Sequence, residues 1–260
     1  ARIIGITPAV TLLGIEVGAS ALKLFIVELQ EGAEGEGSGE EPDVEALTIA
    51  GIDSIGFIGG YRIEAVQAEY PQFEFRHNLD WPNNNILASL FCAEDLMDEP
   101  FVCCYSDCLF TPGVVGGVID SPGEICLSVD TGWRERYAER TEHPTDDAEK
   151  VTASEGVITR VERETPENEA YGEFTGVARF SAEGADSLKT AYHQCRQRCD
   201  GGPFRAAAVF EKAYFIHLLQ EMVEAGKTMF HADTSGQYIE IDTQQDFEYA
   251  RAHWTSGGIA

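Results

Sequence analysis

The sequence predicts a three-layer α/β fold, in which a mostly parallel β-sheet is covered by helices on both faces. Three observations lead to this expectation. Short apolar runs alternate with segments of helical period through the first half of the chain. After residue 130 the pattern changes, and a small β-hairpin insertion is expected around Glu155-Gly156. The 260 residues, 43% of them hydrophobic, suffice for one large domain or two small ones.

The first half of the chain supplies most of the expected sheet. Apolar runs typical of strands cover 2–15, 53–61, 73–78, 100–110 and 123–131. Helical patterns lie between them and cover 45–51, 62–70, 83–97 and 112–121. Residues 31–44 are rich in Gly and Glu and lack apolar periodicity, so we expect a mobile loop there.

The second half adds the hairpin, two further strands and three helices. The hairpin is expected over 150–163 and a strand over 172–181, followed by a helix over 181–199 with Ser181 as its N-cap. A long amphipathic helix is expected over about 205–225. Residues 237–254 indicate a strand, a Thr243 cap and a closing helix.

The charge of the chain limits its partners and its location. The net charge is −27, from 45 acidic and 18 basic residues, and such a field repels nucleic acids. No run reaches the roughly 18–20 apolar residues of a membrane span, and no signal-peptide pattern is present. We therefore expect a cytoplasmic protein with no nucleic-acid or membrane partner.

The seven cysteines contain no C-x-x-C pair, and Cys103, Cys104 and Cys126 lie in apolar runs. We interpret them as buried, reduced thiols. The alternative is a metal site formed by His193, Cys195 and Cys199 on one helix face, although a fourth ligand is not evident.

Carboxylates at two distant points of the sequence are candidate metal ligands. Asp107 ends an apolar strand, where ligands bind in parallel α/β sheets; the alternative is an Asp that caps the following turn. Glu240 and Asp242 are two apart on a strand and share a face, which is either a cation site or a solvent-facing edge. Asp107 and Asp242 together would form a hard-cation site typical of Mg²⁺-dependent phosphoryl chemistry.

A third candidate lies at the start of the helix predicted over 83–97. Asn85 and Ser89 are one turn apart there, near free backbone N–H groups, which suits a phosphate or a nucleobase. The alternative is an ordinary capped helix.

Five motifs in order resemble the bacterial nucleotidyltransferase family. They are AGIDSIGFIGGYRIEAV, HNLDWPNNNILASLFCAEDL, FVCCYSDCLF, GEFTGVARFSAEGA and YIEIDTQQDFEYAR. The resemblance covers about residues 44 to 254 and is strongest to the cytidylyltransferase branch, which includes the phosphocholine and 2-aminoethylphosphonate enzymes. It implies one domain over 1–254, a tail at 255–260 and a three-layer α/β/α Rossmann-like sheet.

The resemblance also implies a site. Asp107 and Asp242 match the two carboxylates that hold catalytic Mg²⁺ in the family, with Glu240 close by. Asn85 and Ser89 match the helix that shapes the nucleotide and acceptor pocket. The implied reaction transfers a cytidylyl group from CTP to phosphocholine or 2-aminoethylphosphonate and releases pyrophosphate.

Acceptor contacts are implied at a second set of positions. Glu173 matches a position that faces the acceptor, and Lys150 is placed to reach a phosphate. A cationic acceptor group could bind between aromatic and carboxylate side chains, for which the candidates are Trp133, Tyr171, Glu173 and Trp81. For the two tryptophans the alternative is a buried position in the core. A monomer and a homodimer both remain open.

The N-terminal stretch departs from the family pattern. A Gly-rich phosphate loop is expected there, and Gly14, Gly18 and Ser20 are the candidates for it, with Lys23 as the catalytic lysine. However, Glu16 stands where a small residue is expected. Three explanations are open: the chain is an active enzyme with a rebuilt loop, it is an inactive relative that still binds a nucleotide or partner, or these residues contain a frame error or a misassigned stretch. A sugar-1-phosphate nucleotidyltransferase is the alternative enzyme.

Overall fold

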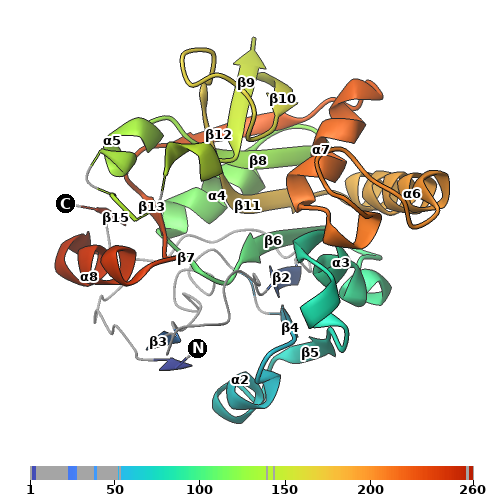
Figure 1. The fold of residues 1–260 in the computed structure, drawn as a ribbon, viewed down its shortest axis with the longest axis horizontal. Coiled ribbons are helices and arrows are strands. Elements are labelled where there is room, and N and C mark those ends of the chain that lie inside the picture. Colours follow the sequence, from blue (N-terminus) through green and yellow to red (C-terminus); the bar gives the residue numbers. More distant parts are fainter. Residues whose placement is uncertain are drawn as a thin grey trace.

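A computed structural model describes residues 52 and 54–255, apart from 139 and 143, together with the backbone of 2–3, 23–27, 38–39 and 258–259. Within these residues, nine strands form the main sheet in the order β5-β4-β2-β6-β11-β8-β12-β10-β9 (Figure 1). In chain order its strands are β2 (Lys23–Val27), β4 (Ser54–Gly59), β5 (Glu74–His77), β6 (Phe101–Tyr105), β8 (Ile125–Asp130), β9 (Lys150–Ser154), β10 (Val157–Val161), β11 (Gly172–Phe180) and β12 (Phe230–Thr234).

The sheet is mixed, so the expectation of a mostly parallel sheet is corrected. Strands β5, β4, β2 and β6 run parallel, as do β8 and β12. Strand β11 lies between β6 and β8 and is antiparallel to both. Every residue of β11 is buried, including Glu173, Thr175 and Arg179, so the strand lacks the alternation of apolar and polar residues that is typical of an antiparallel strand with one solvated face.

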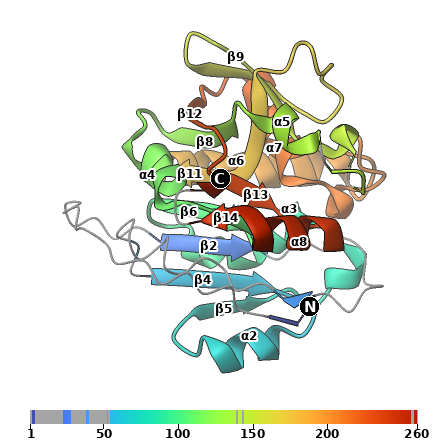
Figure 2. The same cartoon turned by 90° about the vertical axis from the view of Figure 1, so that its left-hand side faces the viewer.

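Helices cover both faces of the sheet, as predicted. In chain order they are α2 (Ile63–Glu69), α3 (Ile86–Leu90), α4 (Pro112–Asp120), α5 (Trp133–Tyr137), α6 (Ala182–Cys199), α7 (Phe215–Glu224) and α8 (Gln244–His253). Figure 2 shows α4 on one side of β8 and β11 and α7 on the other. One continuous hydrophobic cluster joins these layers and includes Phe101, Phe180 and Phe215.

The predicted hairpin is present and extends the edge of the main sheet. Strands β9 and β10 pair antiparallel on either side of Glu155 and Gly156. Both turn residues have positive φ, 54° and 79°, which is the conformation of the tightest hairpin turns. Glycine at the second position satisfies this requirement without steric cost.

Two predicted helix starts are confirmed, and one predicted helix is shorter than expected. The Ser181 hydroxyl accepts a hydrogen bond from Gly184 N at 3.1 Å, and Thr243 caps α8 in the same way. The helix expected over 205–225 is limited to α7, with a single 3-10 turn before it. Tyr214 is the N-cap of α7, and its backbone N–H donates to His217 Nδ1, which stabilises the start of the helix at this point.

Much of the N-terminal prediction lies outside the described residues. Gly14, Gly18 and Ser20 lie there, as do the helix expected over 45–51 and most of the loop expected over 31–44. The described strand β2 was not expected at this position, yet it lies between β4 and β6 in the parallel part of the sheet.

The seven cysteines are all free, and Cys103, Cys104 and Cys126 are buried, as predicted. The His193–Cys195–Cys199 alternative receives no support: within the described part of the chain, these residues form no group close enough to share a metal ion. His193 instead pairs with Glu94. No described helix combines the length and the apolar character needed to cross a membrane.

Candidate active site

The first carboxylate of the site follows the parallel strand β6. The run predicted as one strand over 100–110 breaks at Ser106-Asp107, and β7 (Cys108–Phe110) leaves the sheet in a new direction. Asp107 therefore lies directly after the carboxyl end of β6, where binding sites of parallel α/β sheets form.

A second strand brings Glu240 to this position from the far end of the chain. Strand β13 (Tyr238–Glu240) pairs antiparallel with β7, and Glu240 lies opposite Cys108 in the register. The Ile241 backbone N–H donates to the Asp107 carbonyl at 2.9 Å and extends this pairing by one bond. Figure 1 shows β7 and β13 together beneath α5 and beside α8.

The side chains of Asp107, Cys108 and Glu240 converge. Their ligand atoms lie within 4.8 Å of one another, and theirs is the one such group among the residues that the structure describes. The Cys108 thiol also contacts Asp107 Oδ1 at 3.5 Å. Asp242 follows on the exposed side, close enough for its charge to act on both carboxylates.

The carboxylates repel one another in a poorly hydrated site. Burial, and then the charge of Asp242, raises the pKa of Asp107 to about 8. The same two causes raise the pKa of Glu240 well above its usual range, and Asp107 adds to the effect. A group of acids whose ionisation is opposed by burial and by like charge gains stability from a positive partner.

A divalent cation fits this group of acids. Carboxylate oxygens are the ligands that Mg²⁺ prefers, and Asp107 and Glu240 offer them from two paired strands. The thiol of Cys108 is a soft ligand and does not suit Mg²⁺. The donor set therefore fits Mg²⁺ through its oxygens alone.

Glu173 lies in a buried ionic network beside this group. Arg136 pairs with Asp130 at 2.6 Å and with Glu173, and all three side chains are almost fully buried. Tyr137 donates to Glu173 at 2.7 Å. The Arg136 guanidinium also lies over the ring of Tyr238, 4.5 Å from its centroid, which connects the network to β13. Glu173 is therefore neutralised within the protein and does not present a free carboxylate to an acceptor.

The predicted aromatic wall is not assembled. Trp133 is fully buried in a small cluster with Tyr137, so the core alternative holds for this residue. Trp81 is half-buried against Tyr61. Tyr171 is 40% exposed and donates to Asp233, and no described contact joins it to Trp133.

The two predicted catalytic lysines begin strands β2 and β9. Lys23 begins β2 and pairs with Phe101 at the amino end of β6. It is therefore separated from the Asp107 end of the sheet by the length of a five-residue strand, about 13 Å. Lys150 is buried, and its ammonium group donates to the Arg163 carbonyl at 2.7 Å.

Asn85 precedes the short helix α3 and Ser89 lies one turn later in it, within a polar network that sequence reasoning did not identify. Asn85 is the N-cap, and its side chain accepts from Ile86 N at 2.7 Å. The buried Asn78 amide donates to Ser89 Oγ at 2.7 Å and to Asn84 Oδ1 at 2.8 Å. The run of asparagines at 83–85 was the available signal for this network.

Glu149 is a further acid that the sequence did not point to. It accepts a hydrogen bond from Tyr105 at 3.2 Å, and its charge also raises the pKa of Asp107. It precedes Lys150 at the start of β9, and this position gave no signal because only the fold brings β9 near the end of β6.

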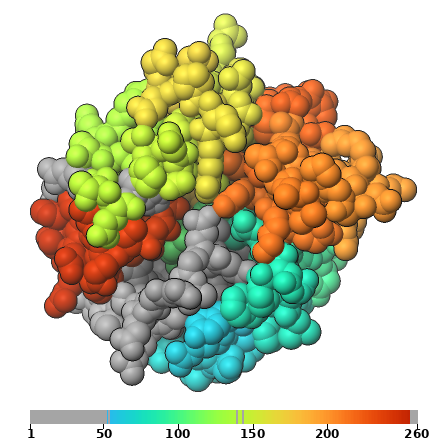
Figure 3. Space-filling model, viewed as in Figure 1, coloured from blue at the N-terminus to red at the C-terminus, as the bar shows by residue number. Residues whose placement is uncertain are grey.

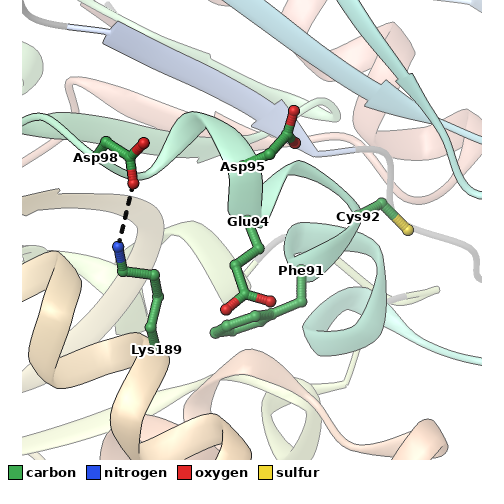
Figure 4. Close-up of a pocket in the computed structure, with 6 residues that line it drawn as sticks. All are labelled: Phe91, Cys92, Glu94, Asp95, Asp98 and Lys189. Carbon is green, nitrogen blue, oxygen red and sulfur yellow. Dashed lines mark hydrogen bonds and ion pairs between the residues drawn. The ribbon is translucent and has the colours of Figure 1, made fainter.

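A surface cavity among the described residues is lined by none of these carboxylates. It is lined by Phe91, Cys92, Glu94, Asp95, Asp98 and Lys189 (Figure 4). Its charged groups pair locally: Lys189 with Asp98, Glu94 with His193, and Asp95 with Arg76. These pairs give it the character of a salt-bridged surface and not of a reaction site.

Comparisons with known proteins show which proteins this chain is similar to. No family model matches the chain. A CTP:phosphoglutamine cytidylyltransferase from Campylobacter jejuni is 24% identical over 216 residues, which cover 79% of this chain and 84% of the relative.

Solved structures share the fold. The inositol-1-phosphate CTP transferase from T. maritima superposes with a TM-score of 0.62 at 18% identity, covering 87% of this chain and 92% of that one. The CTP:phosphocholine cytidylyltransferase from Streptococcus pneumoniae gives 0.61 at 14% identity, covering 89% and 97%. The matches confirm the resemblance to bacterial nucleotidyltransferases and the α/β class of the fold.

Proposed function

We propose that this nucleotidyltransferase transfers the cytidylyl group of CTP to a small phosphorylated or phosphonate acceptor, releases pyrophosphate and requires Mg²⁺. The observation that carries the proposal is the convergence of Asp107 and Glu240, from strands more than a hundred residues apart, at the carboxyl end of β6. The 24%-identical cytidylyltransferase supports CTP as the donor.

The reaction needs charge neutralisation and positioning more than a protein nucleophile. An acceptor oxygen attacks the α-phosphorus of CTP, a new P–O bond forms, and the bond to the β-phosphate oxygen breaks as pyrophosphate leaves. Mg²⁺, when bound, would neutralise the charge of the phosphates and orient them for this displacement. The buried cysteines have no required part in this chemistry.

Asp107, Glu240 and Asp242 would hold the cation. The pairing of β7 with β13 fixes the first two at one position on the sheet edge, and Asp242 adds a third carboxylate at the exposed side. Without a cation the same carboxylates would repel a triphosphate, and the net charge of −27 on the whole chain would add to this repulsion. Nucleotide binding would therefore depend on the metal.

Acceptor choice rests on the phosphate or phosphonate group. The resemblance to phosphocholine and 2-aminoethylphosphonate enzymes suggests a small acceptor with a cationic group, and the Campylobacter relative is named for phosphoglutamine. In the structure, Tyr171 with Asp233 presents an aromatic ring and a carboxylate at the surface. Such a pair could attract an ammonium group.

A pyrophosphate-release assay tests the proposal. The chain is incubated with Mg²⁺ and each of CTP, UTP, ATP and dTTP, against phosphocholine, 2-aminoethylphosphonate, phosphoglutamine, inositol-1-phosphate and glucose-1-phosphate. We expect release with CTP and at least one of the first four acceptors. Preference for glucose-1-phosphate with UTP or dTTP would favour a sugar-phosphate nucleotidyltransferase, and binding of Mg·CTP without turnover would indicate a silent relative.

A further inference from the structure

One buried ion pair lies behind the C-terminal carboxylates. Arg140, three residues after the end of α5, places Nε 2.6 Å from Asp246 Oδ1 in the first turn of α8. The two side chains are 4% and 0% exposed. The solvation lost when two charges are buried commonly offsets much of the attraction between them. Stability alone is therefore a weak reason for a pair at this position.

Both partners also bind the backbone of candidate metal ligands. Arg140 Nη2 donates to the Glu240 carbonyl at 3.3 Å. Asp246 Oδ2 accepts from the backbone N–H of Asp242 at 3.3 Å, and from the N–H and hydroxyl of Thr243 at 3.0 and 2.8 Å. One ion pair thus contacts the main chain at each of the two carboxylates.

The position of the pair matters because strand pairing ends just before Asp242. The register of β13 with β7 stops at Glu240, and a single further bond joins Ile241 to Asp107. Beyond that bond, the Asp246 side chain accepts a hydrogen bond from the Asp242 main chain. The backbone orientation at Asp242 therefore depends on Asp246, and Asp246 is itself fixed by Arg140.

Arg140 connects this segment to a rigid part of the protein. Its guanidinium lies over the ring of Tyr137, 5.0 Å from the centroid, and Tyr137 donates to the buried Glu173 of β11. Figure 3 shows the C-terminal segment, in red, against the yellow-green segment that contains α5. A chain of buried contacts thus runs from the main sheet to the carboxylates.

We propose that Arg140 and Asp246 are positioning residues, which set the placement of Glu240 and Asp242 relative to Asp107 for a divalent cation. The inference rests on the proposed metal site. Mg²⁺ requires near-octahedral geometry at 2.0–2.1 Å, so small displacements of a carboxylate weaken its binding. Partners that orient metal ligands typically contribute about 10- to 100-fold to metal affinity.

Metal affinity can be measured without turnover. Mn²⁺, a spectroscopic substitute for Mg²⁺, is titrated into the full chain, and free Mn²⁺ is followed by electron paramagnetic resonance. We expect Arg140→Met to raise the Kd for Mn²⁺ at least about tenfold, and Arg140→Lys, which keeps the charge but loses the forked geometry, to raise it by a smaller factor. Asp246→Asn should fall between the two.

A destabilised control separates positioning from general loss of structure. Leu188 is fully buried on α6, far from the site in the sequence and on another element, so Leu188→Ala should lower the melting temperature and leave the Kd unchanged. If Arg140→Met does not fold, Arg140→Lys decides the question. Folded Arg140 and Asp246 variants with Kd values within twofold of the wild-type value would overturn the positioning role. A wild-type chain that binds no Mn²⁺ would instead overturn the metal site itself.

Discussion

The proton and the metal ion should compete for Asp107. Burial and the charge of Asp242 raise its pKa to about 8, whereas only the ionised carboxylate binds a divalent cation. Lowering the pH from 8 to 6 reduces the ionised fraction of Asp107 from about a half to about a hundredth. The apparent affinity for Mn²⁺ should therefore fall about fiftyfold over these two pH units.

The sign and the size of this effect both follow from the raised pKa. An ordinary carboxyl, with a pKa near 3.8, is ionised throughout this range and would give a constant affinity. The raised pKa of Glu240 acts in the same direction. Titration of free Mn²⁺ by electron paramagnetic resonance at pH 6, 7 and 8 provides the measurement.

Asp107→Asn is the control for this experiment. It removes the competing proton together with the charge, so its Mn²⁺ binding should be weak and should depend less on pH than that of the wild type. A wild-type affinity that is constant between pH 6 and pH 8 would refute the reasoning, because Asp107 would then carry its charge without help from a metal.

Two further predictions concern stability. Arg136→Met leaves the buried charges of Asp130 and Glu173 without their partner, and should lower the free energy of unfolding by about 3–5 kcal/mol in urea titrations; a loss below about 1 kcal/mol would contradict the role of the network. Burial lowers the pKa of His217 from 6.5 to about 4, so its contribution is complete above pH 6.5 and is lost as the pH falls towards 4. Between pH 7 and pH 4.5 this loss should be about 2–3 kcal/mol, and His217→Asn should lose measurably less over the same range.

The sequence was most informative where local chemistry determines the structure. Caps at Ser181 and Thr243 and the positive-φ turn at Glu155-Gly156 depend on neighbouring residues, and the structure has all three. Asp107 and Asp242 were paired from the sequence and the family resemblance, with Glu240 close by. The structure instead groups Asp107 with Cys108 and Glu240, and Asp242 follows on the exposed side.

Strand direction and the environment of single side chains depend on distant parts of the chain. The fully buried β11 shows no alternation of buried and exposed residues, so its antiparallel pairing was not predictable from its residues. Glu173 matches an acceptor position by resemblance, but Arg136 and Tyr137 from α5 enclose it. Lys23 was assigned by analogy with a loop, whereas its register with Phe101 places it at the opposite end of the sheet.

The Arg140–Asp246 pair shows a third limit of sequence reasoning. The two residues are more than a hundred positions apart, and although Asp246 lies within the YIEIDTQQDFEYAR motif, nothing in the sequence connects it to Arg140. Their connection to Glu240 and Asp242 runs through backbone groups, which carry no sequence signal at all.

Acceptor-dependent release of pyrophosphate from CTP, measured side by side for the wild-type chain and Asp107→Ala with and without Mg²⁺, tests the proposed chemistry most directly. We expect release by the wild type only when CTP, Mg²⁺ and a phosphorylated or phosphonate acceptor are all present, and a loss of at least about a thousandfold in Asp107→Ala. Undiminished turnover by a folded Asp107→Ala chain, or by the wild type after removal of divalent cations, would contradict the assignment of this carboxylate group as the catalytic metal site.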